Sequence, residues 1–279
     1  MHESDTGLIL SGLDWLIAHH KAKEKHRRQM VEDLRLQPGD RLLDLASGPG
    51  LWTTLFAEQV KPNGKVVGVD ISANSIEFAR KALTEYPTYQ DVVEYKQGSF
   101  DNIPYDDNCF DVVFCANCLN YSDSKQREQI LQEQKRVTKP GGRVISKEFD
   151  EGATMYYPVP PELMLKVKAA MGKTVTNNLT GKYFDHFVGR QMRELFLSGG
   201  FQNVSTRFYP TPIFSPLTEK EKKYLFGFAR WFSKAASPYL SEIDKKMWDS
   251  YFDPTSSEYI LDREDFYFCE VAIFNVGIV

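Results

Sequence analysis

Residues 42–50 read LLDLASGPG, an apolar run that ends in a short segment of small residues. Residues 41–46 have the length and composition of a buried strand, and a helical pattern begins at Leu51. A glycine-rich turn between a strand and a helix is typical of nucleotide-binding α/β proteins, because glycine lets the main chain approach a ligand. We therefore expect Gly48 and Gly50 to lie against a bound nucleotide or nucleoside.

The same alternation of apolar runs and helical patterns continues along the chain. Further apolar runs lie at residues 65–71, 91–98, 110–116, 143–149, 201–209 and 266–276. Short apolar runs separated by helices predict parallel strands joined by crossover helices. We expect an α/β fold with a doubly wound, mostly parallel seven-stranded sheet that binds its ligand at the carboxyl ends of the strands.

Three segments depart from this alternation and predict the domain organisation. Residues 1–38 read as a helical N-terminal extension. Residues 39–212 and 263–279 are predicted to form the cofactor-binding α/β core, which carries a helical cap insertion at 151–188. Residues 213–262 hold eleven aromatic side chains in fifty positions and predict an aromatic-rich helical cap.

The composition limits the possible classes of partner. A formal net charge of -4 argues against nucleic acid, whose phosphates require a basic surface. No secretory signal and no apolar stretch of about 18 residues is present, so we expect no integral membrane association. Four cysteines are too few for a disulfide scaffold, and we interpret Cys115 and Cys118 as buried thiols, with no metal site. These features predict a cytoplasmic protein, with a homo-oligomer left open.

The spacing after the glycine turn discriminates between cofactors. An acidic residue is expected about 20 positions on, at the end of the second strand, to accept the ribose hydroxyls; Asp70 stands there. Thr53 replaces the third glycine of the dinucleotide fingerprint, which disfavours an NAD-dependent oxidoreductase. Asp44 places a carboxylate at the turn, which suits a cationic ligand such as S-adenosylmethionine (SAM). Ile71 is expected to pack on the adenine.

Five ordered stretches between residues 39 and 150 resemble the class I SAM-dependent methyltransferases, in particular the ubiquinone and menaquinone C-methyltransferase-like group. These stretches are LDLASGPG, VVGVDIS, GSFDNIP, FDVVFC and RVTKPGGRVI. The resemblance implies that the cofactor contacts the residues that match these motifs: Asp44, Ala46, Gly48, Gly50, Asp70, Ile71, Ser99, Phe100 and Asn117. Ser99 stands where the family usually has an aspartate for the adenine amino group, so a serine hydroxyl replaces a charged acceptor.

The acceptor of the methyl group is predicted to bind above the strand ends, under the cap segments. His186, Glu148 and His20 are candidate catalytic bases, and Tyr183, His186 and Trp231 are candidate substrate contacts. The alternative for the cap aromatics is a purely structural core in which Leu225, Phe228, Phe232 and Ala236 share the buried face of one helix.

The sequence thus predicts a SAM-dependent methyltransferase that acts on a small, apolar or aromatic organic acceptor at carbon or oxygen, in biosynthetic or secondary metabolism. An NAD-dependent oxidoreductase and a catalytically silent cofactor-binding protein are the alternatives.

Overall fold

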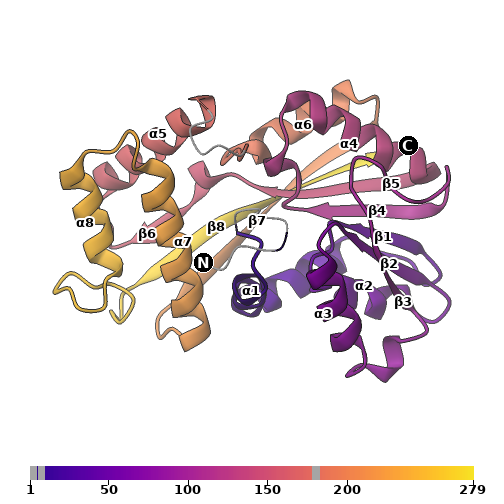
Figure 1. The fold of residues 1–279 in the computed structure, drawn as a ribbon, viewed down its shortest axis with the longest axis horizontal. Coiled ribbons are helices and arrows are strands. Elements are labelled where there is room, and N and C mark those ends of the chain that lie inside the picture. The colour runs from indigo at the N-terminus through magenta and orange to yellow at the C-terminus, as the bar shows by residue number, and fades with distance from the viewer. Residues whose placement is uncertain (1–4, 6–9, 178–182) are drawn as a thin grey trace.

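The alternating segments form one mixed sheet, shown in Figure 1. This computed structural model describes residue 5, residues 10–177 and residues 183–279. The parallel part of the sheet consists of β1 (Arg41–Leu45), β2 (Lys65–Asp70), β3 (Val93–Gln97), β4 (Phe110–Ala116) and β5 (Thr138–Phe149), in the spatial order β3-β2-β1-β4-β5. The predicted βαβ alternation is therefore confirmed.

The last strands of the chain complete the sheet in antiparallel directions. β8 (Tyr267–Ile278) pairs with β5 on one side and with β7 (Gln202–Phe214) on the other. A short β6 (Met155–Tyr157) pairs with β8 beyond the end of β5, so it continues the line of β5. The sheet is thus seven strands wide, as predicted, and contains the additional strand β6.

Helices cover both faces of this sheet, which makes the fold doubly wound. On one face, α2 (Thr53–Val60), α3 (Ala73–Leu83) and the end of α1 (Leu13–Asp33) share a core with residues such as Leu42 and Phe114. On the other face, α4 (Ser124–Val137) and α6 (Met192–Ser198) pack over Leu43 and Val113. Successive strand residues point to opposite faces, which explains why the strands are apolar throughout.

Polar residues cap the N-termini of several helices through side-chain hydrogen bonds. The Ser72 hydroxyl accepts the backbone N–H of Ser75 at the start of α3. Thr218 and Glu221 form a capping box at the start of α7 (Glu219–Ala236).

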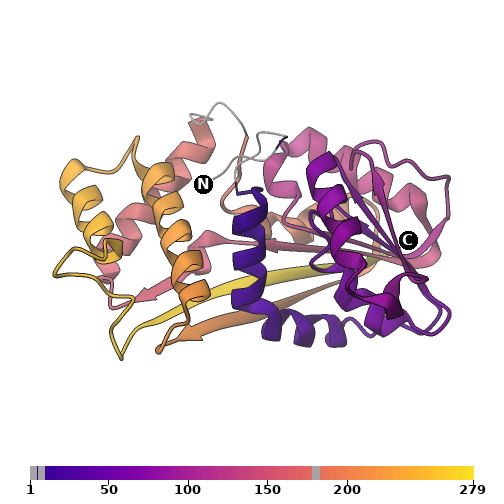
Figure 2. The ribbon, with the colours of Figure 1, turned by 60° about the horizontal axis from the view of Figure 1, so that its bottom comes forward.

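The cap builds its own hydrophobic core around the outer ends of β6, β7 and β8. Its helices are α5 (Pro161–Asn177), α7 and α8 (Glu242–Phe252), and they contribute Tyr224, Trp231, Phe232 and Trp248 to this core. The four α7 residues predicted to share a buried face are all buried. Figures 1 and 2 show α1 standing between α7 and the helices of the parallel sheet.

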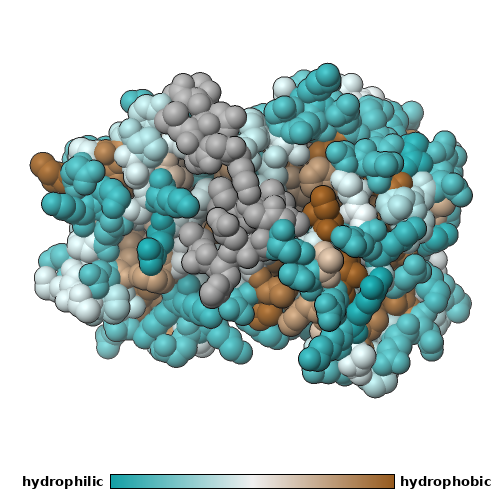
Figure 3. Space-filling model, in the orientation of Figure 1, coloured by the Kyte–Doolittle hydropathy of each residue, from teal (hydrophilic) through white to brown (hydrophobic). Residues whose placement is uncertain are grey.

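Among the described residues, no helix is both long and apolar enough to cross a bilayer. The face in Figure 3 is mainly hydrophilic at its rim, and hydrophobic atoms gather toward the middle of the molecule.

Candidate active site

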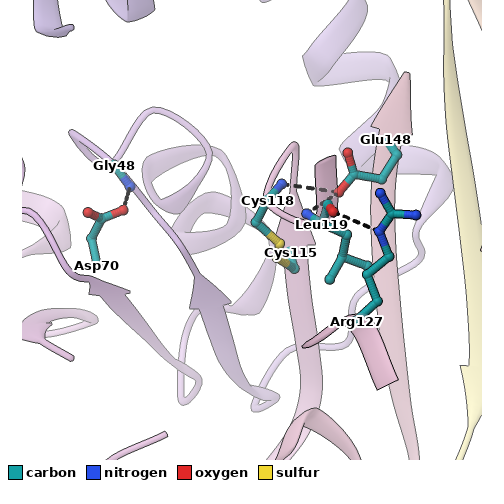
Figure 4. The surroundings of a disulfide bond; sticks show 7 residues. All are labelled: Gly48, Asp70, Cys115, Cys118, Leu119, Arg127 and Glu148. Atoms are coloured by element: carbon teal, nitrogen blue, oxygen red, sulfur yellow. Dashed lines mark hydrogen bonds between the residues drawn. A yellow bond between two sulfur atoms is a disulfide. The ribbon is translucent and has the colours of Figure 1, made fainter. Parts of the chain in front are cut away.

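The glycine turn after β1 meets the end of β2 in the predicted way. Ala46, Gly48 and Gly50 all have positive φ angles, of 56°, 53° and 78°. The backbone N–H of Gly48 donates to the Asp70 carboxylate at 2.7 Å, as Figure 4 shows. The other carboxylate oxygen of Asp70 accepts the N–H of Ser72 at 2.8 Å. These two bonds fix the carboxylate next to the turn and leave each oxygen capacity for a further hydrogen bond.

A cavity of about 150 Å³ lies at the carboxyl ends of β1, β2 and β4. Six of the nine residues predicted to contact the cofactor line it: Ala46, Gly48, Asp70, Ile71, Phe100 and Asn117. A Cβ added at Gly48 would meet only Leu16, at 3.7 Å. The turn therefore presents main chain to open space. Asp70 lies in partly desolvated surroundings, and burial raises its pKa.

The other three predicted cofactor residues do not line this cavity. Asp44 is buried beneath the turn and accepts the Thr53 hydroxyl at 2.6 Å; burial raises the pKa of Asp44 to about 7. A Cβ at Gly50 would collide with the Tyr95 hydroxyl, so this glycine serves packing. The Ser99 hydroxyl donates to Asp101. In this structure, Asp44, Gly50 and Ser99 therefore make no direct contact with the space that a ligand would fill.

The candidate catalytic and substrate residues also lie away from the cavity. His186 is buried, with its Nδ1 2.5 Å from Glu151 and its ring stacked on Trp231 at 5.4 Å. His20 accepts from Arg27 at 2.9 Å, and burial followed by the charge of Arg27 lowers its pKa to about 3. Tyr183 lies under the Arg127 guanidinium, 5.5 Å from it.

One oxygen of the Glu148 carboxylate binds main-chain donors, while the other is buried without a hydrogen-bond partner among the described residues. Its carboxylate accepts the backbone N–H groups of Cys118 and Leu119 at 3.1 and 3.0 Å, as Figure 4 shows. Burial raises the pKa of Glu148 to about 7. It therefore holds the loop after β4, which carries Asn117 and Cys118 to the cavity wall.

The same loop corrects the prediction of two buried thiols. Cys115 and Cys118 form a disulfide, drawn in Figure 4, while Cys109 and Cys269 are free. Asn117 adopts a positive φ of 55°, which turns the chain back so that the two Cα atoms lie 6.6 Å apart. The expected cytoplasmic location rested partly on reduced cysteines, and this disulfide removes that support.

Several cavity residues were not identified from the sequence. α1 contributes Trp15, Leu16, His19 and Arg27, and later segments contribute Tyr121, Phe149 and Phe184. The signal available in the sequence was the spacing on α1, where Trp15, His19, Lys23 and Arg27 recur every four residues and so share one face. Aromatic and basic side chains on one face of an otherwise polar helix indicate a buried polar contact.

Comparison with known proteins agrees with this geometry. Residues 36–203 match the family described as "Methyltransferase domain". A demethylmenaquinone methyltransferase from Symbiobacterium thermophilum is 41% identical over 125 residues, which are 45% of this chain and 49% of that protein. The match thus spans about half the length of that relative. A demethylmenaquinone methyltransferase from Lactobacillus johnsonii is 30% identical over 64% of this chain and 74% of its own.

A solved structure shares the fold. A geranyl diphosphate methyltransferase in complex with SAM superimposes with a TM-score of 0.53 at 15% identity, covering 95% of this chain and 88% of the other. The NAD-dependent alternative finds no support in these matches. With the glycine turn, Asp70 and the cavity assembled at the strand ends, the chain belongs to the class I SAM-dependent methyltransferases, in the group that resembles the ubiquinone and menaquinone enzymes.

Proposed function

We propose that this methyltransferase acts on a small, apolar or aromatic organic acceptor and methylates it at carbon or oxygen. The observation that carries the proposal is the aromatic part of the lining of the cavity that the glycine turn also lines. This aromatic wall consists of rings from α1, from the end of β5 and from the segments after β4 and before α6: Trp15, Phe149, Tyr121 and Phe184. Flat apolar rings favour binding of a flat apolar acceptor, because its burial removes hydrocarbon surface from water.

The residues at the strand ends fit the cofactor. Asp70 is placed to accept the ribose hydroxyls, because both of its oxygens retain acceptor capacity and it lines the cavity. Ile71 and Phe100 provide apolar surface for the adenine, and the main chain of Gly48 lies against the ligand. SAM, when bound, supplies an electrophilic methyl group on a sulfonium centre. We retain Ala46 and Asn117 as further cofactor contacts.

The aromatic wall is proposed to hold the acceptor in position for methyl transfer. Methyl transfer requires the acceptor atom about 3 Å from the methyl carbon, in line with the leaving sulfur, so the acceptor must be held rigidly. Tyr121 and Phe184 contact each other edge to face at 5.2 Å, which fixes both rings. Burial raises the pKa of Tyr121, so its phenol stays protonated at neutral pH and adds no negative charge to this wall.

The names of the relatives support the same class of acceptor. Two of them are demethylmenaquinone methyltransferases, which are named for a quinone-type aromatic acceptor. We propose accordingly that residues 213–262 and 151–188 act as a cap beside an α/β core, and that Trp15 and Phe184 take the substrate-contacting role predicted for Tyr183, His186 and Trp231.

An acceptor panel tests this proposal. The purified protein is incubated with SAM labelled in the methyl group and with an alkylated hydroquinone, a simple phenol, an aliphatic amine or a short DNA duplex. We expect label in the hydroquinone or the phenol, with the methylated atom assigned by NMR of the product. Transfer to the amine or to the DNA alone would contradict the proposed acceptor class. Phe184→Ala should reduce turnover more than affinity for S-adenosylhomocysteine.

A further inference from the structure

Among the residues that the structure describes, two arginines are almost completely buried, and they differ in their partners. Arg127 of α4 is 1% exposed and forms an ion pair with Asp185 at 2.9 Å. Its remaining N–H groups donate to the side chain of Gln191 at 2.9 Å and to the carbonyl of Leu119 at 3.0 Å. Arg127 is therefore neutralised by a carboxylate of the protein itself.

Arg27 of α1 has no such counter-ion. It is 6% exposed, and within residues 10–177 and 183–279 no carboxylate lies within ion-pair distance of it. Its guanidinium donates to Nδ1 of His20 at 2.9 Å and to Nδ1 of His19 at 3.3 Å, and it lies over the Trp52 ring at 4.7 Å. A nitrogen that accepts from arginine carries no proton, so these imidazoles bring no negative charge.

The carboxylates nearest Arg27, Glu270 and Asp44, favour its charge only through space, because their oxygens are bound by other groups. Glu270 of β8 is bound by Lys23 and by the Tyr224 hydroxyl of α7, the latter at 3.0 Å. Asp44 of β1 is bound by Thr53. Lys147 of β5 donates to Asn117 at 2.7 Å and adds a further positive charge to this region. The buried carboxylates of this region, including Glu148 beside Lys147, are thus engaged by other donors, and none of them forms a direct ion pair with Arg27.

A buried charge without a partner is unfavourable, and arginine cannot escape by losing its proton near neutral pH. Burial lowers the pKa of Arg27 only to about 10. Arg27 also lines the cavity, together with His19, Trp52 and the glycine turn. The missing negative charge is therefore expected to come from a molecule in the cavity.

We propose that Arg27 binds the carboxylate of the amino-acid tail of SAM. The inference rests on the cofactor site proposed above and adds a residue outside the five motifs. Trp52 follows directly after the glycine turn, so a guanidinium over Trp52 stands at the turn side of the cavity. His19 positions the guanidinium, because its ring is held between Trp15 at 4.8 Å and Tyr224 at 5.3 Å.

A binding cycle tests the contact directly. Isothermal titration calorimetry measures the affinity of the full chain for S-adenosylhomocysteine and for its decarboxylated analogue, which keeps the amine. We expect the wild type to prefer the carboxylate-bearing ligand by roughly ten- to a hundredfold, as for one charge-assisted contact. In Arg27→Met the preference should fall to near one. Arg28→Met, an exposed neighbour on the same helix, should keep the wild-type preference.

The ligand-free protein provides a second readout. Because Arg27 lacks a counter-ion, Arg27→Met should unfold at the same temperature as the wild type or higher, whereas Arg127→Met should unfold at a clearly lower temperature. Arg27→Lys, which keeps the charge but not the planar fork, should show an intermediate ligand preference and replaces Arg27→Met if that variant does not fold.

The outcomes separate the two proposals. If the wild type binds neither ligand, the proposed cofactor site is wrong. If it binds both equally, or if Arg27→Met keeps the full preference, the site stands and the Arg27 contact is wrong; its counter-charge then belongs to the acceptor.

Discussion

The carboxyl edge of the parallel sheet and the helical cap both bury polar side chains, but the partners of those side chains differ. At the edge, Asp70 accepts two backbone N–H groups and still lines a cavity. In the cap, His186 is bound by Glu151 at 2.5 Å and stacks on Trp231, and neither ring reaches the cavity. The first arrangement leaves capacity for a ligand, whereas the second satisfies the histidine within the protein.

This difference between Asp70 and His186 shows which reactive side chains are good candidates for a functional site. A histidine or tryptophan in an aromatic-rich insertion is attractive as a site residue, yet its first requirement is to find partners when it is buried. The cap consists of three helices that must build a core of their own, and its aromatic rings supply that core. Residues at strand ends have their partners in the main chain of the adjacent turn, which frees the side chain for function.

Removal of an aromatic side chain from the cap should have the largest effect, and this effect should be a loss of folding stability. Trp231 is fully buried and contacts Phe184 at 5.1 Å. We expect Trp231→Ala to lower the free energy of unfolding by about 3–5 kcal/mol, as for other large-to-small core changes. Urea unfolding measures this. Affinity for S-adenosylhomocysteine per folded molecule should change little, since Trp231 does not line the cavity.

Phe226→Ala is the matched control, because Phe226 lies on the same helix but is 37% exposed. If Trp231→Ala unfolds like the wild type and instead loses turnover, the cap ring belongs to the acceptor site and the comparison above is wrong.

Loss of the Asp70 carboxylate should weaken binding of the cofactor product S-adenosylhomocysteine. Asp70→Ala is expected to weaken S-adenosylhomocysteine by about 1.5–3 kcal/mol, or ten- to over a hundredfold, because a charged acceptor of the ribose is removed. Asp70→Asn keeps the shape and should show a smaller loss. Calorimetry measures both variants, with the exposed Asp106→Ala as the control. Equal affinity in all three would place the ribose elsewhere.

Most of the fold was accessible from the sequence because it repeats one simple pattern. Valine- and leucine-rich runs give the parallel strands, and the helices between them begin at capping residues such as Ser72. β6 was not predicted, because three residues carry too little pattern to identify a strand. Its pairing depends on β8, more than a hundred residues later in the chain.

The site was accessible only where function depends on main-chain geometry. Gly48 and Asp70 follow from the turn and the spacing, and both line the cavity. Trp15, His19 and Arg27 reach it because α1 packs between the cap and the sheet; their spacing indicates one shared buried face but not what that face packs against. Glu148 and His186 were attractive because of their chemical type, but their partners come from distant segments that only the folded chain brings together.

The contribution of Glu148 to folding stability is expected to depend on pH. Burial raises its pKa to about 7 from the ordinary 4.5. Between these pH values the folded protein holds a proton that the unfolded chain has released, so the contribution of Glu148 to stability falls as pH rises from about 4.5 to about 7.

Glu148→Gln imitates the protonated form and should flatten this decline, by roughly 2–3 kcal/mol between pH 5 and pH 8. Urea unfolding across that range measures it, with the exposed Glu162→Gln as a control that should leave the profile unchanged. An unchanged profile in Glu148→Gln would mean that this carboxylate is ionised throughout.

The smallest effect is expected at Ser99, where the sequence resemblance implied an adenine contact. Ser99 does not line the cavity, and its hydroxyl donates to Asp101, whereas the adjacent Phe100 does line it. Ser99→Ala should therefore change the affinity for S-adenosylhomocysteine by less than about threefold, well under 1 kcal/mol. Phe100→Ala should weaken it more, because it removes apolar surface that covers the ligand. Calorimetry of the two variants decides between them: a larger loss in Ser99→Ala would show that the serine turns toward the adenine when the cofactor binds.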